Sequence, residues 1–171
     1  MDRERFAEHL SAPAGRGVPV AGGHDGAAGG AACGDLVRIT LRVEGDRVAR
    51  AGFEASGCGA LTAAASAAVT LVEGEPLLDA ARVGAHEVSE ELGGLSPGKF
   101  HAADLVADAL HGALGRAALA QAALAPAAGR TLVAMSGGVD SAVAALLAAD
   151  NGLDRKFANA GATSCVINRT S

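Results

Sequence analysis

The stretch LVRITLRV at Leu36–Val43, followed by EGD at Glu44–Asp46 and RVARAGFEA at Arg47–Ala55, decides the fold of this chain. β-branched residues and a partial alternation that places Arg38 and Arg42 on one face are typical of a strand. The Glu-Gly-Asp sequence is typical of the turn between two strands. These residues therefore predict a β-hairpin.

Helical patterns follow the hairpin. An Ala-rich run from Cys58 to about Glu73 is entered through Ser56-Gly57 and is stopped by Gly74, as expected for a helix. Two more helices are expected after it, at about 86–92 and 99–114. Before the hairpin, residues 2–10 predict a short helix and residues 12–32 a loop rich in Gly, Ala and Pro. An order of strands first and helices afterwards predicts the α+β class.

A boundary is expected after the last of these helices. Ala117–Gly129 is Ala-rich and broken by Pro126, so it is either a linker or a frayed helix. Thr131–Met135 is a short apolar strand, and a further helix is expected up to about Ala149, whereas the last twenty residues show no periodicity. We therefore divide the chain into a domain at 1–118, a linker at 119–129 and a second segment at 130–171.

The composition excludes several classes of protein. With 42 Ala and 24 Gly residues, the bulky apolar side chains are mostly Leu and Val, so we expect a small core built from closely approaching elements. The net charge of −5 includes no basic stripe that could bind nucleic acid strongly. The longest uncharged run is too rich in Ala, Gly, Ser and Thr to span a membrane. We expect no signal peptide, because no apolar segment follows the charged residues 2–5. We expect a cytoplasmic protein without a membrane partner. In that compartment cysteines serve as thiols, metal ligands or sulfur carriers more often than as disulfides.

Three separate places put candidate metal ligands at the ends of predicted elements. These are Cys33-Gly34-Asp35 before a strand, Gly57-Cys58-Gly59 at a helix start, and Lys99-Phe100-His101 at another helix start. Thiolate and imidazole suit zinc or iron, a carboxylate can complete four ligands, and helix N-termini favour the thiolate. By spacing alone, the same residues also fit a packed Cys58, a cysteine in a loop and a helix-capping histidine.

A set of short motifs in a fixed order covers about residues 2–118. The set comprises Arg5-Phe6, Glu8-His9, Pro13, Cys33-Gly34-Asp35, Phe53, Gly57-Cys58-Gly59 and Leu95–His101. With these motifs the chain resembles the IscU/NifU N-terminal family, whose members are scaffolds for iron–sulfur cluster assembly. The resemblance implies a small antiparallel sheet covered by helices. It also implies a cysteine desulfurase or another sulfur donor as partner.

The resemblance also implies a ligand set. Cys33 and Cys58 match two of the three cluster-binding cysteines of the family, and Asp35 matches an aspartate that tunes cluster lability and can bind zinc. Lys99 and His101 match a lysine and a histidine that flank the assembly site in that family. The third cysteine should directly follow the histidine, but Ala102 stands there. Ser96 and Gly98 also depart from the usual chaperone-recognition segment. The implied metal ligands are Cys33, Asp35, Cys58 and His101, for zinc or for an iron–sulfur cluster that lacks one thiolate.

A second motif follows the predicted strand of the last segment. In Ser136-Gly137-Gly138-Val139-Asp140-Ser141, two glycines let backbone amides converge on an anion at a helix N-terminus. Ser136 and Ser141 offer hydroxyls, and Asp140 could reach a Mg²⁺ ion that accompanies phosphates. No lysine follows the glycines, so this is not a Walker A loop. An ordinary Gly-rich turn between strand and helix is the alternative.

Leu132–Ala145 resembles the loop of ATP pyrophosphatases and, among them, that of the tRNA 2-thiouridylases (MnmA). The resemblance implies that Ser136, Gly137, Gly138, Val139, Asp140 and Ser141 hold ATP with Mg²⁺, whereas tRNA would bind only a further downstream domain. Two functions stay open: a scaffold domain that serves tRNA thiolation in a fusion protein, or a truncated ATP-dependent tRNA-uridine 2-sulfurtransferase with an accessory scaffold. A scaffold used only for protein contacts is a third. We expect no thiolation by the 171 residues alone, and Cys165 receives no role.

Overall fold

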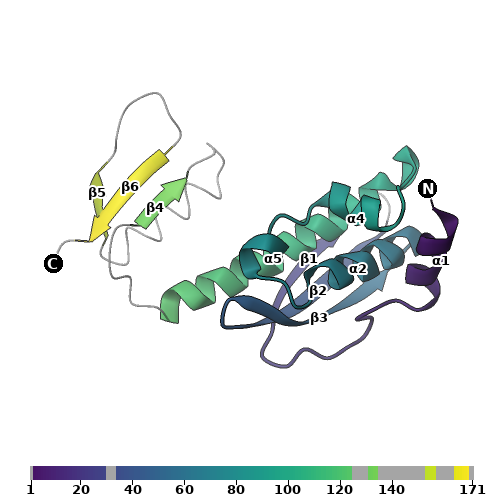
Figure 1. Ribbon diagram of the computed structural model, residues 1–171, viewed down its shortest axis with the longest axis horizontal. Helices are drawn as coiled ribbons and strands as arrows, with labels where there is room; N and C mark the ends of the chain where they lie inside the picture. The colour runs from purple at the N-terminus through teal and green to yellow at the C-terminus, as the bar shows by residue number, and fades with distance from the viewer. Residues whose placement is uncertain (1, 30–33, 125–130, 135–152, 157–163, 170–171) are drawn as a thin grey trace. The chain divides into compact units, whose positions relative to one another are not determined.

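The computed structural model describes residues 2–29, 34–124, 131–134, 153–156 and 164–169 (Figure 1). The chain divides into two compact units, Met1–Gln121 and Ala122–Ser171. Each unit has its own three-stranded sheet.

The first unit packs helices against an antiparallel sheet of strand order β1-β2-β3. The α+β class and the small helix-covered sheet are thus confirmed. Its elements are α1 (Arg3–Ser11), β1 (His24–Gly29), β2 (Leu36–Glu44), β3 (Arg47–Ser56), α2 (Gly59–Val72), α3 (Leu77–Ala80), α4 (Ala85–Glu91), a 3₁₀ turn (Pro97–Lys99) and α5 (Phe100–Leu124).

The predicted hairpin is present as β2 and β3. Val37, Ile39 and Leu41 are fully buried under the helices, whereas Arg38 and Arg42, which alternate with them along the strand, are exposed. This is the alternation expected of a strand with one face on the core and the other in water. The hairpin therefore supplies one wall of the core.

The interior of this unit is built largely from alanine. In α2, 11 of the 14 residues are buried, and six of these are alanines. Helices with so many methyl side chains can approach their neighbours closely, and larger buried residues such as Ile39, Leu61 and Leu110 complete the packing. The Ala-rich composition therefore does make a core, but one with little room for larger side chains.

The sequence predicted that the whole Gly-rich stretch before the hairpin is a loop. This was wrong in part, because residues 24–29 form β1. This strand pairs with β2 along its whole length, from His24 opposite Leu41 to Gly29 opposite Leu36. The small residues of β1 allow α5 to pack close to the strand, because a Cβ at Gly26 would overlap the Ala109 carbonyl. Glycine and alanine have low strand propensity. The formation of β1 is therefore explained by its pairing with β2 and its close contact with α5, and not by the propensity of its residues.

The last helix of the first unit is longer than predicted. The sequence favoured about 99–114, but α5 continues to Leu124, shortly before Pro126. The added turns are rich in alanine, which has the highest helix propensity. The turn α3 and the 3₁₀ turn were also not predicted.

The second unit contains β4 (Thr131–Ala134), β5 (Leu153–Lys156) and β6 (Ser164–Arg169), in the order β4-β6-β5 with antiparallel pairing. The strand predicted from Thr131 is present as β4, whereas β5 and β6 were not predicted. The loop Ser136–Ser141 and the helix expected after it lie outside the described residues.

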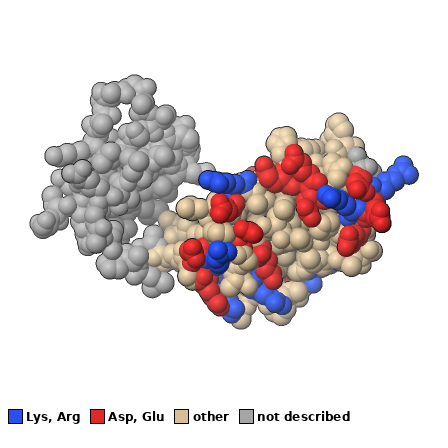
Figure 2. All heavy atoms as spheres, in the orientation of Figure 1, with Lys and Arg blue, Asp and Glu red and all other residues tan. Residues whose placement is uncertain are grey.

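Charged side chains are mixed over the visible face of the first unit. Figure 2 shows Lys and Arg interspersed with Asp and Glu on this face. None of the described helices combines the length and the apolar composition that crossing a membrane requires.

Candidate metal centre

Asp35, Cys58 and His101 meet at one end of the sheet. Asp35 directly precedes β2, Cys58 is the N-cap residue of α2, and His101 lies in the first turn of α5. Their ligand atoms all lie within 4.8 Å of one another. Asp35 Oδ2 is 3.3 Å from Cys58 Sγ and 3.4 Å from His101 Nε2. The structure thus brings together three of the four ligands implied by the sequence.

The hairpin register explains why Asp35 and Cys58 are neighbours. Leu36 is paired with Ser56, so the residues just beyond this pair, Asp35 and Gly57, face each other. Gly57 has a φ of +144°, and a Cβ there would overlap Asp35 Oδ1. Only glycine allows this close approach without strain. It leaves Cys58 with its backbone N–H directed at Asp35 Oδ1, at 2.9 Å.

Asp35 is the buried acceptor of the group, with 5 % of its surface exposed. The backbone N–H of Cys58 holds the pKa of the Asp35 carboxyl below its usual value, with further help from the Cys58 thiol and His101, while burial opposes the shift. At neutral pH this side chain is therefore an anionic acceptor that faces a thiol and an imidazole.

These residues fit a four-coordinate metal ion. Zinc takes thiolate, imidazole and carboxylate ligands at about 2.0–2.3 Å, which places neighbouring ligand atoms roughly 3.3–3.8 Å apart in a tetrahedron. Both distances from Asp35 Oδ2 agree with that spacing. Cys58 and His101 are exposed, so the group can be reached from solvent. Cys33 lies outside the described residues and remains a predicted fourth ligand.

Two neighbours of His101 do not join the ligand group. Ala102, where the resemblance implies a third cysteine, is fully buried in the core. Lys99 Nζ lies 5.3 Å from the centre of the Phe6 ring, a cation–π contact with α1. Neither residue adds a ligand to Asp35, Cys58 and His101.

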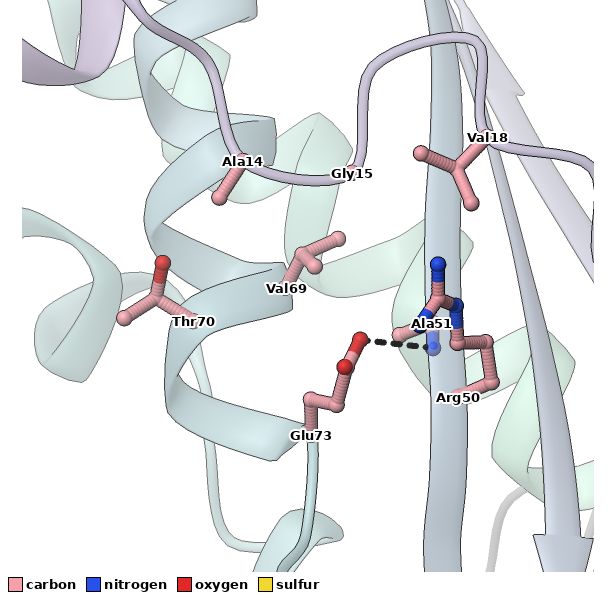
Figure 3. A pocket seen from close by; sticks show the side chains of 8 residues that line it. All are labelled: Ala14, Gly15, Val18, Arg50, Ala51, Val69, Thr70 and Glu73. Carbon is pink, nitrogen blue, oxygen red and sulfur yellow. Dashed lines mark hydrogen bonds between the residues drawn. The ribbon is translucent and has the colours of Figure 1, made fainter.

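Two features outside the candidate metal centre had no clear signal in the sequence. The first is a polar network of α1 around His9 and the buried Ser66. The second is a hollow of about 340 Å³ between residues 14–18, β3 and the end of α2, drawn in Figure 3. In it Glu73 accepts a hydrogen bond from the Ala51 N–H. The hollow shares no residue with the candidate metal centre.

Comparison with known proteins points to one family. The profile of the NifU-like N-terminal domain matches residues 1–121. A protein of Rubrobacter xylanophilus named "Bifunctional protein NifU/MnmA" is 47 % identical over 111 residues, which are 64 % of this chain and 23 % of that protein. The scaffold protein IscU of Aquifex aeolicus is 34 % identical over 113 residues, which are 65 % of this chain and 72 % of that protein.

Solved structures show the same fold. A NifU-like N-terminal protein from Brucella abortus superimposes with a TM-score of 0.53 at 19 % identity, over 68 % of this chain and 93 % of that one. A scaffold protein for the SUF system from Fervidobacterium islandicum gives 0.54 at 16 % identity, over 65 % and 94 %. With the profile match over most of its length, the chain belongs to the family of NifU-like N-terminal domains.

Proposed function

We propose that residues 1–121 act as a scaffold for iron–sulfur cluster assembly. The observation that carries this proposal is the meeting of Asp35, Cys58 and His101 at the positions of the family motifs, with ligand atoms within 4.8 Å. Iron and sulfide, or zinc in their place, are then the cargo of the site. IscU-named relatives such as that of Aquifex aeolicus support the assignment.

The ligand types suggest how cargo is held and released. Cys58, with the predicted ligand Cys33, supplies the soft thiolates that iron–sulfur clusters and zinc prefer. Asp35 adds a hard carboxylate, and Ala102 leaves the site without a third thiolate. Because Cys58 and His101 are exposed, a sulfur donor such as a cysteine desulfurase can reach the group. We expect weaker retention of a cluster here than in a site with three thiolates.

Metal and sulfide analysis of anaerobically purified protein tests this function. We expect bound metal in the wild type and its loss in Cys58→Ala. Cys165→Ser is the matched control, because Cys165 lies in β6 of the second unit and should leave metal content unchanged. Stoichiometric iron with labile sulfide identifies a cluster scaffold and zinc alone identifies a zinc-binding descendant. Wild-type protein that takes up neither would refute the proposal.

We further propose that this scaffold domain serves tRNA thiolation as part of a fusion. Two observations favour it: the Ser136–Ser141 sequence, and the relative whose name joins NifU to MnmA. Tethering a sulfur-handling domain to a sulfur-consuming enzyme would raise the local concentration of the donor. The test is ATP-dependent tRNA thiolation in the presence of a cysteine desulfurase. We expect none from the 171 residues alone and activity only when an ATP-pyrophosphatase domain follows; activity of the short chain would contradict this division of labour.

A further inference from the structure

Helix α1 bridges the two segments that carry the exposed ligands of the metal centre. The side chain of Leu10 lies against Gly59, the residue after Cys58, where an added Cβ would be 3.3 Å from Leu10 Cδ1. The ring of Phe6 lies under Lys99, two residues before His101. The position of α1 therefore bears on the spacing between Cys58 and His101.

Apolar burial contributes little to holding α1 in this position. None of its residues is buried, and Phe6 is only partly buried against the core. Besides these contacts, the Asp2 N–H at its start donates to the Gly93 carbonyl at 2.8 Å. The other anchor is His9, whose side chain is 14 % exposed.

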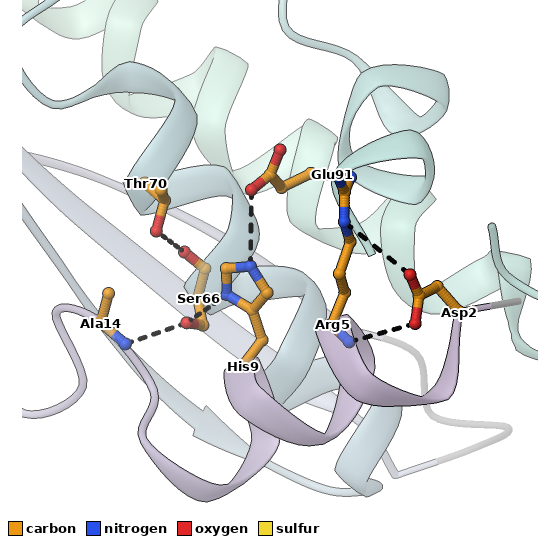
Figure 4. Close-up of polar contacts among 7 residues, drawn as sticks. All are labelled: Asp2, Arg5, His9, Ala14, Ser66, Thr70 and Glu91. Atoms are coloured by element: carbon orange, nitrogen blue, oxygen red, sulfur yellow. Dashed lines mark hydrogen bonds and ion pairs between the residues drawn. The ribbon is translucent and has the colours of Figure 1, made fainter. Parts of the chain in front are cut away.

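His9 joins α1 to both α2 and α4 (Figure 4). Its Nδ1 is 2.9 Å from Ser66 Oγ, and its Nε2 is 3.6 Å from Glu91 Oε1. Ser66 is fully buried in α2, and its Oγ also accepts the N–H of Ala14, the residue that leads the chain away from α1, at 2.9 Å. A hydroxyl both donates and accepts, so Ser66 Oγ can donate to Nδ1 when the histidine proton is on Nε2 and can accept from Nδ1–H in the other tautomer.

We propose that His9 is a positioning residue of the metal centre, which holds α1 across the Cys58 and His101 segments through the Ser66 hydroxyl. The inference rests on the proposed metal binding at that centre. With α1 in place, Leu10 covers the start of α2 and Phe6 supports the 99–101 segment, so the two ligands keep the separation that one ion needs. Loss of the His9–Ser66 bond frees both contacts.

Metal binding and the docking of α1 are expected to favour each other, because thermodynamic linkage is reciprocal. An ion that requires Cys58 and His101 at a fixed separation favours the state with α1 docked, and docked α1 in turn raises the affinity for the ion. Couplings of this kind typically change affinity by about 5–150-fold. Since α1 supplies no ligand, we expect an effect at the low end of this range.

Zinc affinity of the full 171-residue chain, measured by competition with a chelator, is the test. We expect His9→Ala to weaken Zn²⁺ binding about five- to tenfold. His9→Asn keeps an acceptor at the position of Nδ1 and should restore affinity to within about twofold, whereas His9→Gln, with its amide nearer Nε2, should not. Glu8→Ala changes an exposed neighbour on α1 and should bind as the wild type does.

Two further readouts separate positioning from a general loss of fold. The thiolate-to-metal band of the Co²⁺-loaded protein should weaken in His9→Gln but not in His9→Asn, and Zn²⁺ should slow amide exchange in α1 of the wild type. If His9→Ala does not fold, the comparison of His9→Asn with His9→Gln still tests the inference. Equal affinity of the Gln variant, Asn variant and wild type overturns this inference but leaves the proposed function standing, whereas a wild type that binds no metal overturns both.

Discussion

Helix α2 begins at Cys58 of the candidate metal centre and α1 contacts residues next to the candidate ligands, but the two helices are held by opposite means. In α2, 11 of 14 residues are buried, whereas α1 buries none of its nine. α2 is fixed by the packing of methyl groups, which is sensitive to volume, and α1 by a few polar contacts, which are sensitive to single atoms. A ligand on α2 thus has a rigid support, while a helix like α1 can adjust the site without disturbing the core.

The largest expected effect comes from adding volume to α2. Ala64 is fully buried, so Ala64→Leu should lower the free energy of unfolding by about 1–3 kcal/mol or prevent folding. Ala7→Leu introduces the same side chain on the exposed surface of α1 and should change stability by less than about 0.5 kcal/mol. Urea unfolding of the two variants measures both values. Equal losses would remove the distinction between the helices.

The next effect lies at the part-buried polar contact between the two helices. Ser66→Ala removes the hydroxyl and leaves the N–H of Ala14 and Nδ1 of His9 without their partner. We expect a loss of about 1–2 kcal/mol in urea unfolding, because two part-buried polar groups both lose a hydrogen bond. Ser11→Ala removes an exposed hydroxyl at the end of α1 and serves as the control. A cost no greater than that of Ser11→Ala would show that packing alone holds α1.

The sequence predicts the packed parts better than the polar ones. Alternation at Leu36–Val43 reveals the hairpin, and the Ala run reveals α2, because burial imposes a period on the chain. β1 has no such period, since its Gly and Ala residues form a strand only by pairing with β2.

The candidate site divides in the same way. Hairpin register places Asp35 next to the start of α2, so these two parts of the site follow from local pattern, but His101 joins them only through the packing of α5. The contact between His9 and Ser66 joins residues 57 positions apart. A serine within an alanine helix gives no sign of such a partner. Polar contacts of this kind depend on the tertiary arrangement and leave no period in the sequence.

The start of α2 is the place where this packed helix also depends on charge. The pKa of Asp35 is lowered in the folded protein, chiefly by the Cys58 N–H, so the carboxylate stabilises the metal-free fold above its unfolded pKa of about 3.9. That contribution is lost as the pH falls through the lower folded value. Asp35→Asn should therefore be less stable than the wild type at pH 6, and the difference should shrink towards pH 3 in urea unfolding. A difference of the same size at both pH values would contradict the assignment.

The smallest expected effect is confined to the first turn of α1. Asp2 caps this helix, with Oδ1 accepting the N–H of Glu4 at 3.0 Å and that of Arg5 at 3.4 Å. Because the cap is exposed, Asp2→Ala should cost only about 0.5–1 kcal/mol, while Asp2→Asn, which keeps the acceptor, should cost less. Amide exchange should rise in α1 of the alanine variant and stay unchanged in α2, because no methyl packing is altered there. Faster exchange in both helices would mean that α1 and α2 open as one unit, and the division between a packed and a polar-held helix would then fail.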